Sequence, residues 1–185
     1  MIAGARAGAE GAYQELLAAY GPRLYGYFFR ATGSHHDAED LLGELLLRLV
    51  RHLPAYEDRG RFEPWLFSIA ANLVRDRIRR SKTAVPAASL EAEIGDRPPL
   101  AEAIAGHEEP VETGLLREQM RADLAAALES LEEQSRQMVL LRHFGQLSYR
   151  EIAEIFNCPI GTVLARVHRA LKVLRVALED GDESK

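Results

Sequence analysis

The chain has 185 residues, of which 47% are hydrophobic and 28% are charged, a balance typical of a globular protein rather than a fibrous or disordered one. Its single cysteine, Cys158, excludes a disulfide framework and any zinc site built only from cysteines. No apolar run approaches the roughly 20 residues that span a bilayer, and residues 1–11 lack the pattern of a signal peptide. We therefore expect a cytoplasmic protein without membrane insertion.

Composition and charge together predict the domain organisation. Leucine and alanine number 53, whereas valine and isoleucine number 17, which favours helices over strands. Residues 13–82 and 119–178 each carry a net charge of +2, whereas residues 83–118 carry −6 and hold four of the eight prolines. Such a segment, with few large apolar residues, buries too little surface to offset its chain entropy. We predict an all-α protein with a helical domain at 8–82, a flexible acidic linker at 83–110, a second helical domain at 111–178 and an acidic tail at 179–185.

The first domain is expected to begin with two helices. The first carries aromatic and leucine side chains at helical spacing from Tyr13 to Phe28, and Gly21-Pro22 is expected to kink or split it. The second begins at Ser34, an N-cap with Asp37 three residues further on. Its apolar residues recur at three- and four-residue spacing and are expected to face inward. They are Ala38, Leu41, Leu42, Leu45, Leu46, Leu49, Val50 and Leu53.

A turn-rich stretch, 54–61, leads to a third helix that ends in the basic run 75–82. Such a run fits contact with phosphates, although cations near a helix C-terminus also complement the helix dipole. Trp65 is expected in the core. Tyr56 and Phe62, beside polar residues, are better candidates for contact with an unstacked base.

The second domain is expected to hold helices at about 111–130, 132–145, 148–156 and 160–178. The third of them opens with a capping box, in which Ser148 is followed three residues later by Glu151. Ala153 permits close approach of two helices, and Asn157 stands where a turn needs a left-handed backbone, which Asn tolerates well. The last two helices are therefore predicted to form a helix-turn-helix.

The last helix has two predicted faces. The inward face holds Val163, Val167, Ala170, Leu171, Leu174 and Leu178. The outward face holds Arg166, His168, Arg169, Lys172 and Arg175. No acidic residue occurs between Asn157 and Ala177, and a positive helix on a small domain is typical of entry into a DNA major groove. The alternative is a solvated cationic helix face that follows a turn.

Metal-binding and catalytic sites are disfavoured. The histidines and carboxylates of 35–44 are rich in potential ligands, but an acidic first helix turn explains them. A metal-dependent phosphohydrolase would need further His and Asp ligands, and no remaining histidine has a suitable context. Cys158 is expected to pack in the turn. No glycine-rich phosphate loop or Gly-x-Ser-x-Gly elbow occurs, so we expect neither an enzyme nor a bound metal or cofactor.

Motifs in both domains resemble those of one family. Asp37-Ala38-Glu39-Asp40-Leu41-Leu42, Phe62-x-x-Trp65-Leu66-x-x-Ile69-Ala70-x-Asn72 and Asp76-Arg77-x-Arg79-Arg80 are similar to the sigma2 domain of bacterial sigma-70-family factors. Leu147-Ser148-Tyr149-x-Glu151-Ile152-Ala153, Cys158-Pro159-x-Gly161-Thr162-Val163, Arg166 and Arg169-Ala170-Leu171-Lys172 resemble sigma4. Two such domains on a short linker resemble the extracytoplasmic-function (ECF) group of RNA polymerase sigma factors.

The resemblance implies a subunit that binds core RNA polymerase and directs it to promoter DNA. It implies polymerase contacts by Asp37, Asp40, Leu41 and Glu44. It implies melting of the −10 element and capture of the non-template strand by Tyr56, Arg61, Asn72, Arg75, Arg79 and Arg80. It implies reading of the −35 duplex by Thr162, Ala165, Arg166, His168, Arg169 and Lys172. An anti-sigma factor is a further partner that the family leads us to expect.

Some residues depart from the family pattern. Gly43 replaces a usual Gln, and a mid-helix Gly costs about 1 kcal/mol relative to Ala. Leu164 and Ala165 replace a basic and a small polar residue on the side that faces DNA, and Ala71 replaces a frequent Arg. The −35 sequence therefore cannot be taken from the family. The alternative function is a stand-alone helix-turn-helix repressor or activator, which would dimerise on a palindrome without polymerase.

Overall fold

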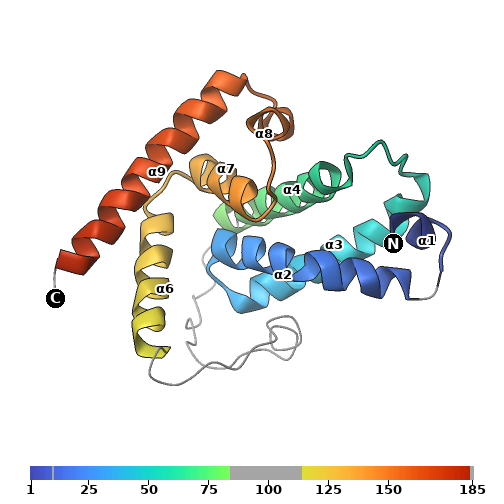
Figure 1. The fold of residues 1–185 in the computed structure, drawn as a ribbon, viewed down its shortest axis with the longest axis horizontal. Coiled ribbons are helices and arrows are strands. Elements are labelled where there is room, and N and C mark those ends of the chain that lie inside the picture. The colour runs from blue at the N-terminus through green and yellow to red at the C-terminus, as the bar shows by residue number, and fades with distance from the viewer. Residues whose placement is uncertain (10, 84–113, 184–185) are drawn as a thin grey trace. The chain divides into compact units, whose positions relative to one another are not determined.

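The computed structural model describes residues 1–9, 11–83 and 114–183. Every regular element within these ranges is a helix, and the chain divides into two compact units, Met1–Ala105 and Gly106–Lys185 (Figure 1). The prediction of an all-α protein with two helical domains is confirmed. The predicted linker at 83–110 lies outside the described residues, apart from its first residue. None of the described helices is long and apolar enough to cross a membrane.

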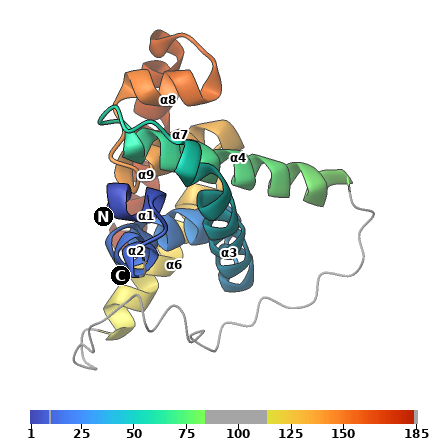
Figure 2. The ribbon, with the colours of Figure 1, turned by 90° about the vertical axis from the view of Figure 1, so that its right-hand side faces the viewer.

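The first unit is a small helical bundle. It contains α1 (Ile2–Arg6), α2 (Ala12–Thr32), α3 (His35–His52), the 3-10 turn η1 (Leu53–Ala55) and α4 (Phe62–Thr83). Helices α2, α3 and α4 pack against one another, and α1 lies against α2 and η1 (Figure 2). The largest fully buried side chains of its core, each at most 1% exposed, are Tyr27, Phe28, Leu42, Leu45, Leu53, Leu66, Phe67 and Leu73. Full burial of such a side chain contributes about 1.5–3 kcal/mol, so this core fixes α4 on α2 and α3.

Local sequence signals set the helix ends of this unit. The Ser34 hydroxyl accepts a hydrogen bond of 3.2 Å from the Asp37 N–H, as predicted for the start of α3. Gly33, with a φ of 72°, ends α2 in the left-handed conformation that favours glycine. The split considered for α2 does not occur. The helix continues through Pro22, because Leu16 and Leu24 on either side of it are buried in the same core.

The outer side of α3 differs from the sequence prediction. Val50 was predicted to face inward but is 50% exposed, and Leu47 is 61% exposed. The described neighbours of α3 are α2, α4 and η1, and the side chains that they bury are those of Ala38, Leu41, Leu42, Leu45 and Leu49. The inward stripe is therefore narrower than the periodicity implies, and apolar side chains remain on the solvent side.

The second unit is built around its last helix. It contains α6 (Gly114–Glu129), α7 (Glu133–His143), α8 (Tyr149–Phe156) and α9 (Ile160–Glu183), and α9 packs against the other three. Val163, Val167, Ala170 and Leu174 form its buried stripe. Leu171 and Leu178, predicted to face inward, are 50% and 37% exposed, because they lie at the edge of this stripe rather than on it.

Candidate nucleic-acid interface

The helix-turn-helix has the predicted turn. Asn157 ends α8 with φ 48° and ψ 52°, which is the left-handed conformation. The Cys158 N–H donates to the Ala153 carbonyl at 3.1 Å and closes the turn. At the other end of α8, the Ser148 N–H donates to Glu151 Oε2 at 2.8 Å, and the Glu151 N–H donates to Ser148 Oγ at 3.3 Å. Both ends of α8 are thus fixed by local sequence, and so is the direction in which α9 leaves the turn.

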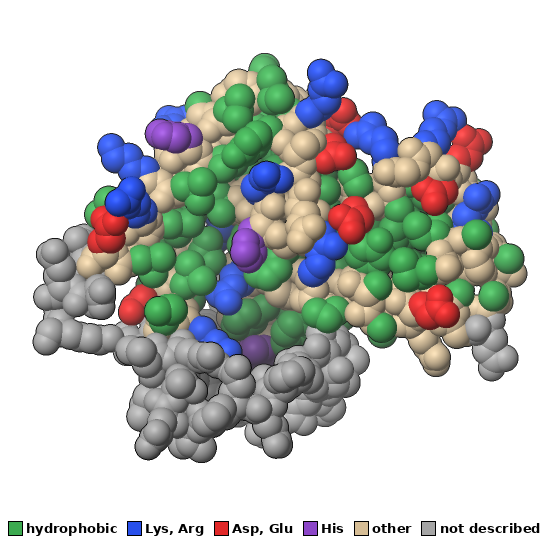
Figure 3. All heavy atoms as spheres, viewed as in Figure 1, with side chains coloured by type: hydrophobic (Ala, Val, Ile, Leu, Met, Phe, Trp, Pro, Cys, Tyr) green, Lys and Arg blue, Asp and Glu red, His purple; other side chains and the backbone are tan. Residues whose placement is uncertain are grey.

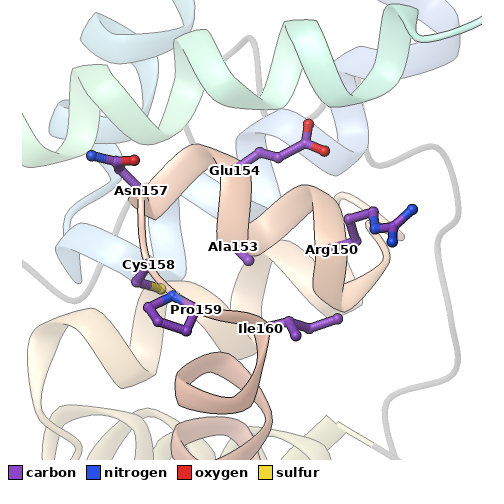
Figure 4. A pocket seen from close by; sticks show the side chains of 7 residues that line it. All are labelled: Arg150, Ala153, Glu154, Asn157, Cys158, Pro159 and Ile160. Carbon is purple, nitrogen blue, oxygen red and sulfur yellow. The ribbon is translucent and has the colours of Figure 1, made fainter.

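An open recess of about 520 Å³ lies at this turn (Figure 4). It is lined by Arg150, Ala153, Glu154, Asn157, Cys158, Pro159 and Ile160. Figure 4 shows Cys158 beside Pro159 in the wall, with Arg150 and Glu154 extending away from the turn. Cys158 is half-buried, in keeping with a small packing group.

The outer side of α9 carries the expected basic residues. His168, Arg169 and Lys172 are exposed on the side opposite the buried stripe. Arg169 Nε donates to the Ala165 carbonyl at 3.2 Å, which lays this side chain along the helix. Figure 3 shows basic and hydrophobic side chains side by side over α9. This surface can meet phosphates and base edges together.

Arg166 differs from the sequence prediction, which has it facing outward. Its side chain is only 26% exposed, and Nη1 lies 3.0 and 2.9 Å from the two carboxylate oxygens of Glu132. The same nitrogen lies 2.9 Å from Oε1 of Gln134. Arg166 therefore joins α9 to the start of α7.

The first two turns of α9 are mostly apolar on their exposed side. Ile160 is 48% exposed and Leu164 is 45% exposed. Ala165, a predicted DNA contact, is also exposed, whereas Thr162 is half-buried. In the sequence, Leu164 is distinguished only as a departure from the family pattern.

A second open recess, also of about 520 Å³, lies in the first unit between η1 and α4, and we call it the cavity. It is lined by His52, Ala55, Tyr56, Glu57, Arg59, Trp65 and Ile69. The rings of Tyr56 and Trp65 are stacked, with centroids 4.4 Å apart and an interplanar angle of 28°. Phe62, the predicted base contact, is 4% exposed and belongs to the core, whereas the half-buried Trp65, predicted in the core, lines the cavity. The positions of the two aromatic residues, in the core and at the surface, are therefore the reverse of those predicted.

The hydroxyl of Tyr56 is buried and has no hydrogen-bond partner among the residues that the structure describes. Burial raises the pKa of Tyr56, and the nearby carboxylate of Asp58 raises this pKa further. The hydroxyl therefore stays neutral at physiological pH, and it can both donate and accept a hydrogen bond. A cavity with a stacked aromatic wall and such a group suits a nucleobase.

The remaining residues that are predicted to contact the −10 element lie along α4 or just before it. Asn72, Arg75 and Arg79 recur at three- and four-residue spacing and so share one side of the helix. Arg75 Nη2 donates to Asn72 Oδ1 at 2.5 Å, and Arg79 Nη2 donates to Asp76 Oδ1 at 3.0 Å. Arg80 is exposed near the end of the helix, and Arg61 is exposed just before its start. The basic side chains thus form a row that leads away from the cavity.

The four residues of α3 that are predicted to contact polymerase differ in their contacts within the unit. Asp37 is paired with Arg77 of α4, and Arg77 Nη2 also lies 3.8 Å from Asp40 Oδ2. Glu44 Oε1 accepts a hydrogen bond of 2.7 Å from Arg48. Leu41 is 3% exposed and packs in the core of the unit, and its contact with polymerase stays a prediction.

Two exposed residues of α3, Leu47 and Val50, were missed by the sequence analysis. With the exposed Gly43 they form a stripe at four- and three-residue spacing, which we call the α3 outer stripe. One sequence signal could have found them: this helix has more apolar residues than one inward face can hold. Leu47, for example, lies outside the predicted inward set. Exposed apolar side chains at helical spacing make this stripe a candidate surface for protein interaction.

The ligand-rich start of α3 is used for packing and local pairing. The His35 ring stacks on Phe29 at 4.2 Å, and His35 Nδ1 lies 2.6 Å from the Tyr25 hydroxyl. His36 Nε2 lies 3.7 Å from Asp40 Oδ2. In the part of the chain that the structure describes, no three His, Cys, Asp or Glu side chains are grouped so as to hold a metal ion.

Comparison with known proteins accounts for both units. The family described as Sigma-70 region 2 matches residues 16–83, and Sigma-70, region 4 matches residues 121–174. The ECF RNA polymerase sigma factor SigW of Bacillus subtilis is 31% identical over 179 residues, which cover 94% of this chain and 92% of that protein. ECF RNA polymerase sigma factor SigE of Mycolicibacterium smegmatis is 35% identical over 88% of this chain and 60% of that protein.

A solved structure has the same fold. The sigma factor RpoE, in complex with the anti-sigma factor NepR from Bartonella quintana, superposes with a TM-score of 0.64 at 21% identity, covering 91% of this chain and 98% of that one. The two family matches fall in the two helical units, and SigW aligns with 94% of the chain. The chain therefore belongs to the ECF sigma factors of the sigma-70 family, non-enzymatic subunits that direct RNA polymerase to promoters.

Proposed function

We propose that the two units divide promoter recognition between single-stranded and duplex DNA. The first unit opens the −10 element and holds the non-template strand, and the second unit reads the −35 element as duplex. The observation that carries this division is the different chemistry of the two surfaces. One has an aromatic cavity beside a basic helix, and the other has a helix-turn-helix with a basic outer side.

In the first unit, an unstacked base enters the cavity of Tyr56 and Trp65. Stacking of a base on an aromatic side chain contributes about 1–3 kcal/mol, enough to offset much of the cost of unpairing. Arg61, at the start of α4, meets phosphates on one side of the cavity. Asn72, Arg75, Arg79 and Arg80 continue the phosphate path along α4.

In the second unit, α9 enters the major groove and the capped start of α8 lies at the backbone, as in other helix-turn-helix domains. His168, Arg169 and Lys172 meet phosphates and base edges, and Thr162 and Ala165 lie nearer the beginning of the helix. Arg166 supports this surface from behind, because Glu132 and Gln134 hold its guanidinium.

Core RNA polymerase docks on the first unit through α3. The α3 outer stripe supplies apolar contact, and Asp40 and Glu44 supply charge beside it. Asp37 contributes indirectly, since its ion pair with Arg77 holds α3 on α4. The protein works in the cytoplasm, where the polymerase is. RpoE of Bartonella quintana has been solved with the anti-sigma factor NepR, and CnrH has been solved with the cytosolic domain of CnrY. We therefore also propose an anti-sigma partner for this chain.

Run-off transcription tests the proposal. Purified core RNA polymerase is combined with a pool of promoter fragments, with and without the full chain. Transcripts that depend on the chain and come from a distinct subset of promoters support the proposed function. Tight binding to a symmetric site without polymerase, with no transcript, would instead support a stand-alone repressor or activator.

A further inference from the structure

The reading end of α9 lacks the side chains that recognise guanine. Between Ile160 and His168, the exposed side chains other than His168 are those of Ile160, Leu164 and Ala165. The one cation in this stretch, Arg166, is held by Glu132 and Gln134. A bidentate Arg or Lys contact to guanine O6 and N7 is therefore not offered by the first two turns, where helix-turn-helix proteins make their base contacts.

Leu164 is 45% exposed, and the helix that carries it has basic side chains on its outer side. The next cations along α9 are Arg169 and Lys172, and no acidic residue occurs on α9 before Glu179. A leucine amid such cations gains nothing from phosphates, but it fits one feature of the major groove. The C5-methyl of thymine is the one apolar group that base edges present there, and small apolar side chains contact it.

We propose that Leu164 and Ala165 are specificity-determining residues that read thymine methyl groups in the −35 element. The inference rests on the proposed role of α9 in reading that element. Arg169 and Lys172 hold the helix against phosphates, and the apolar pair then lies at the floor of the groove. The −35 element of this protein accordingly contains adjacent T·A pairs at the positions that face the start of α9.

The test removes the methyl group without changing base pairing. A −35 element is first selected from randomised promoters with core RNA polymerase and the full chain. Each thymine of the selected element is then replaced in turn by deoxyuridine, which lacks only the C5-methyl. We expect about fourfold weaker holoenzyme binding for each methyl that Leu164 or Ala165 contacts, the equivalent of about 0.8 kcal/mol for one buried CH₂-sized group. Deoxyuridine placed in the spacer serves as the DNA control.

Two leucine variants assign the effect to a side chain. Leu164→Ala should lose the difference between thymine and deoxyuridine at the position that Leu164 contacts, and should retain it at the position that Ala165 contacts. Leu171→Ala removes an equally exposed leucine two turns further along α9, and it should retain the difference. Because the deoxyuridine comparison also uses the unaltered chain, it does not depend on the folding of either variant.

The outcomes separate the inference from the proposed function. Selection of a distinct −35 element that lacks thymine, or that binds equally well with deoxyuridine, would overturn the methyl readout and leave the sigma-factor function standing. An equal loss of discrimination in Leu164→Ala and Leu171→Ala would overturn the assignment to Leu164. Failure to select any element with polymerase would reject the proposed role of α9 and the inference with it.

Discussion

The guanidinium of Arg166 contacts both carboxylate oxygens of Glu132, with Nη1 3.0 Å from Oε1 and 2.9 Å from Oε2. The two residues are 34 positions apart, and they join α9 to the start of α7. A side chain held in this way sets the position of the reading helix. It does so on the edge of α9, away from the row of His168 and Lys172.

Arg166→Ala should therefore weaken DNA binding to a similar degree on all −35 sequences. A bidentate base contact would instead cost about 1–3 kcal/mol at one base pair only. Because the pair is partly exposed, we expect a loss of about 1 kcal/mol or less in the free energy of unfolding. Glu132→Ala should reproduce both effects, and the double variant should be little worse than either one. Dissociation constants on a panel of single-base −35 variants, with urea unfolding, provide the measurement.

Tyr56→Phe tests the cavity of the first unit. The hydroxyl has no hydrogen-bond partner in the described part of the chain, so its removal should change the free energy of unfolding by less than about 0.5 kcal/mol. Promoter opening, measured as permanganate reactivity of −10 thymines, should decrease if a captured base uses this hydroxyl. The matched control is Tyr25→Phe, whose hydroxyl lies 2.6 Å from His35 Nδ1. That variant should lose about 0.5–1.5 kcal/mol of stability and open promoters normally.

Leu47→Glu tests the α3 outer stripe as the polymerase surface. Leu47 is 61% exposed, so the charge should leave the melting temperature almost unchanged. Burial of this carboxylate against polymerase should weaken binding to the core enzyme about tenfold or more. Met120→Glu, at a methionine that is 62% exposed in the second unit, is the control. Equal losses for the two variants in a fluorescence anisotropy titration would count against α3 as the docking helix.

The buried side chain of Tyr27 should make the folded protein less stable at alkaline pH. Burial raises the pKa of Tyr27 far above its ordinary value of 10.0, and within residues 1–9, 11–83 and 114–183 its buried hydroxyl has no hydrogen-bond partner. Above about pH 10 the unfolded chain releases this proton and the folded chain keeps it, so stability decreases by up to about 1.4 kcal/mol per pH unit. Tyr27→Phe should be as stable as the unaltered chain at neutral pH and should lose less in alkali. Urea unfolding between about pH 8 and about pH 11 measures the difference; parallel curves for the two proteins would contradict the assignment.

Local signals in the sequence predicted the parts of the fold that depend on neighbouring residues. The capping box of Ser148 and Glu151 and the left-handed Asn157 both occur as predicted. Each depends on backbone and side-chain groups within a few residues, and such interactions leave a readable pattern. The helix-turn-helix could therefore be built from the sequence alone.

The remainder of the site depends on which elements meet in space. Periodicity marks the apolar positions of a helix but not the width of the side that neighbours cover, so Leu47 and Val50 could not be placed. Phe62 and Trp65 are three residues apart on one helix, and both rings contact Tyr56. Phe62 also packs against Tyr20 of α2, a neighbour that the sequence pattern does not reveal. The partner of Arg166 lies on another helix and leaves no periodic signal.

Trp65 is the single tryptophan of the chain, and it forms a wall of the cavity at η1. All indole fluorescence of the protein therefore comes from this one place. A base that stacks there should quench the emission, whereas DNA bound only to the helix-turn-helix should leave it unchanged. Stopped-flow fluorescence, without any attached dye and with a polymerase blank subtracted, should then follow base capture in real time and separate it from −35 binding.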